Sequence, residues 1–230
     1  MPNLVNSSVF SDLGVGTSLT KTLGFTPADG SSVALLILVG DPARSVSAVT
    51  GYTVAGTVAN VNSLKYEVWI RNGVTGSPTT AAITLDGSTY AFCAALNFDD
   101  DVTFVQLTAK FLGNNTTPGI NGGADDDITV AANSFVGLLV VSNFSRTWSA
   151  ALPSGFAFLN GSATDLQLVY DADIGAGGTI QPSATIDTAN YWEAATLELS
   201  GSAPSGTTPI RRDRRMGGGF GPTFDGGMSG

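Results

Sequence analysis

Carboxylates are the residues with which this chain could do chemistry, and some of them occur in runs. Three aspartates are consecutive at 99–101 and three more at 125–127. Several carboxylate oxygens together suit a hard cation such as calcium. Neither run has the spaced Asp-x-Asp-x-Asp-Gly pattern of a calcium loop, and adjacent strand residues point to opposite faces. We interpret both runs as solvated loop acids, or equally as charges that protect sheet edges, and we expect no metal ion and no cofactor.

Two carboxylates on different strands could instead catalyse hydrolysis. Glu67 and Asp171 are the best such pair, because they lie on echoed strands and paired carboxylates can serve as acid and base at a glycosidic bond. The chain has no His, the commonest general base. Its lysines, Lys21, Lys65 and Lys110, lie in no Ser-x-x-Lys motif. The sequence therefore predicts a protein that is not an enzyme.

Aromatic side chains form a third set, because an exposed cluster could stack against sugar rings. Trp69 and Trp192 fall in strand-like runs, where a Trp is usually buried. Trp148 lies in the loop-like stretch 145–149 and is predicted to be the aromatic that could face a ligand. The single Cys93 cannot form an internal disulfide, and we interpret it as a small strand residue.

The elements that must position these residues are β-strands. Short runs rich in Val, Ile, Thr and aromatics recur between Gly, Asn, Asp and Pro clusters, whereas helical periodicity is almost absent. With 43% hydrophobic and 13% charged residues, the chain can build one sizeable core. Its longest apolar run, 33–39, is too short to cross a bilayer, and we expect no secretory leader. Strands are predicted at 4–10, 19–25, 33–39, 52–58, 64–71, 81–85, 90–98, 103–111, 128–130, 135–144, 156–160, 166–171, 179–186 and 191–199.

An internal repeat organises these strands. The offsets between echoed runs are 100 to 104 residues, a period that covers a whole group of strands. Generic β-alternation could imitate part of the echo. We nevertheless predict an antiparallel β-sandwich, or jelly-roll-like body, with repeat halves at about 32–98 and 134–199. The echoed runs are SVALLILV at 32 and SFVGLLVV at 134, TGY at 50 and SGF at 154, LKYEVW at 64 and LQLVYD at 166, PTTA at 78 and PSAT at 182, and FCAA at 92 and WEAA at 192.

The second half carries a resemblance. The turn LPSGF at 152–156 is followed by LQLVY at 166–170, by GGTIQPSA at 177–184 and by YWEAATL at 191–197. This succession resembles the β-sandwich structural proteins of tailed bacteriophages. The first half departs from it, because VTGY at 49–52 lacks the proline. The resemblance implies a virion protein, either a capsid decoration or cement protein or a tail component.

Charge and composition separate a C-terminal arm from the body. Residues 1–203 contain six basic and 17 acidic residues, so the body should repel nucleic acid. The connector SGSAPSGTTP at 200–209 precedes a Gly-rich stretch with no apolar periodicity. We therefore divide the chain into N-terminal strands at 1–31, a body at 32–200 and an extended arm at 201–230. The arm residues predicted to bind a partner are Arg211, Arg212, Arg214, Arg215, Met216, Phe220, Phe224 and Met228.

Together these features predict a non-enzymatic structural protein located in a virion. It would decorate or cement a capsid, bind other virion proteins and copies of itself, and be anchored to its neighbours by the arm. The alternative is a tail or tail-fibre component, which could include a host-carbohydrate-binding module. Neither hypothesis involves a membrane or nucleic acid bound by the body.

Overall fold

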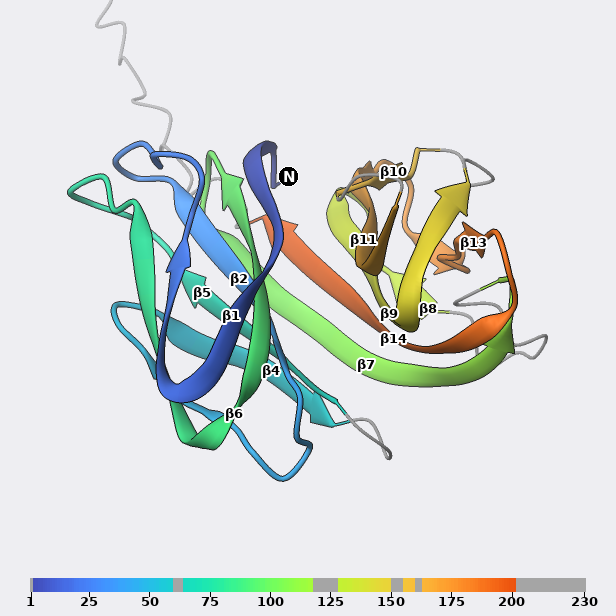
Figure 1. Cartoon of the computed structure of the whole chain (residues 1–230). Coiled ribbons are helices and arrows are strands. Elements are labelled where there is room, and N and C mark those ends of the chain that lie inside the picture. The colour runs from blue at the N-terminus through green and yellow to red at the C-terminus, as the bar shows by residue number, and fades with distance from the viewer. Residues whose placement is uncertain (1, 60–63, 118–127, 150–154, 160–162, 202–230) are drawn as a thin grey trace, which may run out of the picture.

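The computed structural model describes residues 2–59, 64–117, 128–149, 155–159 and 163–201. These residues form an all-β structure of antiparallel strands, as predicted (Figure 1). Within these ranges, no helix is present that has the length and apolar character required to span a membrane. The strands are β1 (Leu4–Thr22), β2 (Ser32–Val39), β3 (Val46–Val49), β4 (Thr53–Ala59), β5 (Lys65–Arg71), β6 (Thr80–Phe98), β7 (Val102–Asn115), β8 (Ile128–Val130), β9 (Ser134–Ser149), β10 (Ala157–Phe158), β11 (Ala163–Ile174), β12 (Gly178–Ile180), β13 (Thr185–Ile186) and β14 (Asn190–Gly201).

Two main sheets repeat one strand order, which confirms the predicted internal repeat. The first sheet has the order β1-β6-β2-β5-β4, and the second has the order β7-β14-β9-β11-β10. When β3, β8, β12 and β13 are left aside, five strands remain in each half, and numbered along the chain they have the order first, fifth, second, fourth, third in both sheets. Every pairing between them is antiparallel. The first half begins with β1 and the second half begins with β7. The N-terminal strand is therefore part of the first sheet.

For β2 and β9, the echo places the right strands together but not the right residues. In β2 the residues that face the second sheet are even-numbered, such as Leu36, whereas in β9 they are odd-numbered, such as Leu139. The sequence echo aligns Leu36 with Leu138, which lies in an outer cluster. Because side chains alternate with a period of two, a shift of one residue reverses every side chain. The predicted overlay of 33–39 on 135–141 is therefore wrong by one residue.

The two sheets pack face to face on a shared central core. Leu36 and Leu96 from the first sheet lie in one cluster with Leu168 and Leu197 from the second. At its centre the rings of Phe98 and Phe135 meet edge to face at 5.6 Å, and Phe135 stacks on Tyr170 at 5.5 Å. A fully buried aromatic contributes on the order of 1.5 to 3 kcal/mol through apolar burial. This core makes the two halves one sandwich.

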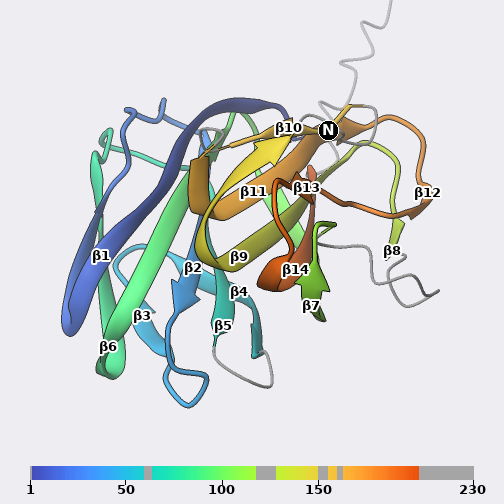
Figure 2. The same cartoon turned by 45° about the vertical axis from the view of Figure 1, so that its right-hand side comes forward.

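Connecting segments cover the outer face of each sheet. On the first sheet, β3 and the initial part of β6 lie over the odd-numbered residues of β2. On the second sheet, β13 and the end of β9 cover one cluster, and the β8/β12 pair covers another (Figure 2). All eight residues of β2 are buried as a result. A strand covered on both faces is apolar at nearly every position, which explains the run at 33–39.

The longest strands were predicted in pieces. Runs at 4–10 and 19–25 belong largely to the continuous β1, and runs at 81–85 and 90–98 belong to β6. The β1/β6 pairing shifts register four times between Leu4 and Ser18. Such bulges bend a strand without ending it, so the polar and glycine residues that signal a turn were misleading here. The short β3 was not predicted, because four residues give too little pattern.

Candidate functional site

The best carboxylate pair of the sequence is not brought together. Glu67 lies in β5 opposite Ile37, whose side chain belongs to the outer cluster of the first sheet. Asp171 lies in β11 opposite Val136, which belongs to an outer cluster of the second sheet. The shared core separates the two outer faces. The arrangement that hydrolysis of a glycosidic bond would need is therefore absent for this pair.

Glu67 is instead a buried structural group. Its Oε1 accepts the backbone N–H of Val46 at 3.0 Å, and its Oε2 accepts the indole N–H of Trp69 at 3.0 Å. The Lys65 ammonium lies 3.7 Å from Oε1. Glu67 thus attaches β3 to the outer face of the first sheet through charge-assisted hydrogen bonds.

A second buried carboxylate, Glu198 in β14, was missed from the sequence. Its Oε1 accepts the backbone N–H of Ala131 at 2.8 Å and the Ser134 hydroxyl at 2.9 Å, while its Oε2 accepts the Gln106 amide at 2.6 Å. It holds the turn between β8 and β9 on the second sheet. The only sequence signal for this group was an acidic residue within the largely apolar run 194–199. A charge that is buried at such a position must be hydrogen-bonded, so the run indicates a buried carboxylate with partners.

The two aspartate runs have different outcomes. Asp99 accepts a hydrogen bond from the Asn3 amide at 2.8 Å, and Asp101 accepts one from the Ser32 hydroxyl at 3.3 Å. All three residues of 99–101 are exposed. No group of three or more potential metal ligands occurs among the residues the structure describes. The second run, 125–127, lies outside those residues.

The aromatic predicted to face a ligand is buried. Trp148 is 3% exposed, lies in β9 rather than in a loop, and contacts Phe158 with ring centroids 6.4 Å apart. The hypothesis of a ligand-facing Trp148 is therefore not supported, because its backbone pairs with Ile186 of β13 and its ring fills an outer cluster. The large exposed aromatics among the described residues are Tyr90 and Tyr191.

Cys93 and Lys21 meet at the buried outer face of the first sheet. Burial raises the pKa of the Cys93 thiol to about 12, and the nearby Lys21 opposes this rise. Burial also lowers the pKa of Lys21. The Lys21 ammonium donates to the Val9 carbonyl and the Ser11 hydroxyl, both at 2.9 Å. The thiol is thus a small buried strand residue held in its protonated form.

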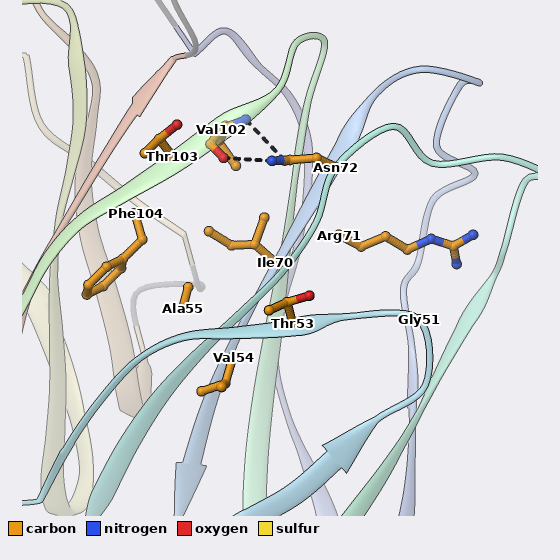
Figure 3. Close-up of a pocket in the computed structure, with 10 residues that line it drawn as sticks. All are labelled: Gly51, Thr53, Val54, Ala55, Ile70, Arg71, Asn72, Val102, Thr103 and Phe104. Carbon is orange, nitrogen blue, oxygen red and sulfur yellow. Dashed lines mark hydrogen bonds between the residues drawn. The ribbon is translucent and has the colours of Figure 1, made fainter.

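The described surface does contain a groove of about 620 Å³ at the edge of the sandwich. It lies where β4, the last strand of the first sheet, meets the start of β7, the last strand of the second. Figure 3 shows Phe104 and Val102 on one wall, Thr53 and Ala55 on the other, and Ile70 between them. The Asn72 amide fixes the upper wall, because it bonds both the N–H and the carbonyl of Val102.

A glycine allows the two edges to meet. A Cβ built on Gly56 of β4 would lie 2.2 Å from the Phe104 ring of β7. The ring therefore rests directly on the backbone of β4. A glycine inside a strand often marks such a close approach, and this was the one sequence signal for the groove.

The predicted partner-binding residues of the arm, which run from Arg211 to Met228, lie outside the described residues. The comparisons add no relative. No protein-family model, no curated protein and no solved structure matches this chain. The features of the chain that bear on function are therefore those of the described body and the point at which the arm leaves it.

Proposed function

We propose that this chain is a non-enzymatic structural subunit of a bacteriophage particle, in which the sandwich is a decoration or cement module and the C-terminal arm holds it to neighbouring subunits. The observation that carries the proposal is the attachment of the arm. Residue 202 follows directly on β14, which is an inner strand of the second sheet. The arm is therefore joined to a strand that has a hydrogen-bonded partner on each side.

This attachment suits a tether. Gly201 lies opposite Val102 of β7, and Ser200 lies opposite Ser134 of β9, so β14 is paired almost to its last residue. A pull on the arm would act along β14 and would have to shear two antiparallel ladders at once. An arm joined to an edge strand would load one ladder only.

The use of the buried carboxylates supports a structural role for the body. Glu67 and Glu198, the two buried carboxylates among the described residues, each attach a connecting segment to a sheet. Their oxygens accept hydrogen bonds from backbone and side-chain donors of the same half. A carboxylate whose oxygens all accept such hydrogen bonds stabilises the fold and is not available to act on a substrate.

A location in the tail or tail fibre remains the alternative proposal. A sugar-binding module built on Trp148 is no longer part of it. Trp69, Trp148 and Trp192 are all buried, with exposed fractions of 6%, 3% and 1%. A stacking platform needs an exposed ring face. The buried tryptophans thus give no support to sugar binding, and decoration of the shell is the location that we propose first.

Deletion of residues 205–230 tests the tether. We expect a folded body that fails to enter particles or is easily lost from them, because the arm makes the contact with neighbours. The matched variant keeps the arm at full length but replaces Arg211, Arg212, Arg214, Arg215, Phe220 and Phe224 by Ser. Loss of incorporation in both variants supports side-chain contacts along the arm, and normal incorporation of the deletion variant contradicts the proposal.

Quantitative mass spectrometry of particles tests the location. A copy number that approaches that of the major shell protein supports decoration. A copy number of a few per particle supports the tail alternative. Absence from purified particles would overturn both.

A further inference from the structure

The groove is open where two sheets end. β4 has a partner on one side only, β5, and β7 likewise pairs only with β14. Edge strands present unpaired backbone N–H and C=O groups, which can bind an extended segment of chain. The described body thus places two such edges side by side around one groove.

The surface of the groove suits apolar side chains. Val54, Ala55, Ile70, Val102 and Phe104 contribute to its lining. Val54 is 48% exposed and so presents apolar surface to solvent. The volume, about 620 Å³, lies within the range of pockets that enclose ligands of several hundred daltons.

The arm starts beside this groove. Gly201, the last described residue, lies opposite Val102, which is itself part of the wall. The connector 202–209 can span roughly 26 to 29 Å when extended. That length is sufficient for the chain to pass the start of β7 and enter the groove from its own body.

Charge favours the same segment. The exposed aspartates 99–101 directly precede Val102 along the chain, so they lie next to the wall that Val102 forms. The arm brings four arginines within 211–215. Arg71 does not oppose this approach, because its side chain points away from the apolar lining in Figure 3 and donates to the Thr75 carbonyl at 3.2 Å.

We propose that the groove between β4 and β7 is the docking site of this chain's own C-terminal arm. The side chain of Phe220 or Phe224 occupies the groove and contacts its apolar lining, and the arginines at 211–215 face the aspartates at 99–101. The glycines on both sides of Phe220, Gly219 and Gly221, let the arm backbone approach the strand edges closely. This docking concerns the free subunit, whereas in a particle the same segment would leave the groove to contact neighbouring subunits, so the docking is tested on the isolated protein.

Limited trypsin digestion of the full-length protein tests the docking, because trypsin cuts after arginine. Thr53→Trp places a bulky ring in the groove from an exposed position of β4, and Thr57→Trp makes the same change on that strand outside the groove lining. We expect cleavage at 211–215 to be on the order of tenfold faster in Thr53→Trp, which corresponds to about 1.4 kcal/mol of lost docking. Thr57→Trp should digest like the original chain.

A second variant guards against misfolding. Thr103→Trp enters the groove from the β7 wall, also at an exposed position, and circular dichroism identifies any variant that has lost its sheet. Equal rates of arm cleavage in the original chain and in the folded groove variants would overturn the proposal.

Protein concentration distinguishes the occupant. Docking within one chain protects the arm equally at every concentration and leaves the protein monomeric in sedimentation. Protection that grows with concentration, together with a dimer, would overturn docking of the chain's own arm and assign the groove to the arm of a second copy, an exchange of identical segments between subunits. Protection should also weaken from low to high salt, because the aspartates that the arginines would face are exposed.

Discussion

The two halves have one strand order but cover their outer faces by different means. In the first half, β3 and the beginning of β6 supply Val46, Ile83 and Leu85 to a broad cluster that is mostly aliphatic and contains one tryptophan, Trp69. In the second half, two-residue and three-residue strands do the covering, and Trp148 and Trp192 fill the space. Equal topology therefore does not require equal packing. Two large rings let shorter strands cover the second sheet.

The buried carboxylates differ in the same way. Glu67 has a lysine within 3.7 Å, whereas the hydrogen bonds of Glu198 come from neutral donors. Both carboxylates fix a crossing segment on a sheet. One carboxylate has a cation beside it, and the other is stabilised by the dipoles of its hydrogen-bond donors. The second solution depends more on each individual contact.

The largest expected effect comes from breaking what the halves share. Phe135→Ala removes the ring between Phe98 and Tyr170 and should lower the free energy of unfolding by about 3 to 5 kcal/mol. Urea unfolding should stay a single transition, because the core joins both sheets. Val15→Ala, at a position 72% exposed, is the control. Two separate transitions, one for each half, would contradict a common core.

Replacing each buried carboxylate by an amide sharpens the comparison. Glu198→Gln should lower the unfolding free energy by about 1 to 3 kcal/mol, because a neutral amide accepts weaker hydrogen bonds and adds donors that must be satisfied. Glu67→Gln should cost less, since Lys65 is partly exposed and can turn to water. Chemical denaturation measures both, with exposed Asp100→Asn as control. A larger loss for Glu67→Gln would reverse the ranking.

The difference in pH dependence between the original chain and Cys93→Ala reports on the first half, where Cys93 lies. Burial raises the pKa of Cys93 from 9.0 to about 12, so the folded state prefers the protonated thiol. This contribution is complete below pH 9 and is lost as the pH rises toward 12. Compared with Cys93→Ala, the original chain should lose stability more steeply, by about 1 kcal/mol per pH unit between pH 9 and 11. Parallel curves would show that the thiol does not titrate on unfolding in this range.

The smallest effect is expected at the surface of the second half. Tyr191 is 61% exposed, and Tyr191→Ser should change the unfolding free energy by less than about 0.5 kcal/mol. The same variant examines the remaining exposed ring of β14 on a glycan array. Specific sugar binding by the original chain that Tyr191→Ser abolishes would revive the carbohydrate-binding alternative.

The sequence by itself determined the class of fold and the repeat. Runs such as 33–39 are apolar at every position because β2 is covered on both faces, and their recurrence about 100 residues later marks equivalent strands. The same property hid the register. A run that is apolar throughout does not say which residues face the shared core, so Leu36 was aligned with Leu138.

Only the tertiary structure decided where the chemical groups stand. Glu67 and Asp171 lie on echoed strands, yet they point to opposite sides of the sandwich, because the outer face of each sheet is turned away from the other. Trp148 looked like a loop residue because polar neighbours flank it, and pairing with β13 buried it. The groove is formed by β4 and β7, which are far apart along the chain and meet only because both are sheet edges. Local pattern records which face of a strand is apolar, whereas contact between edges depends on how complete sheets pack.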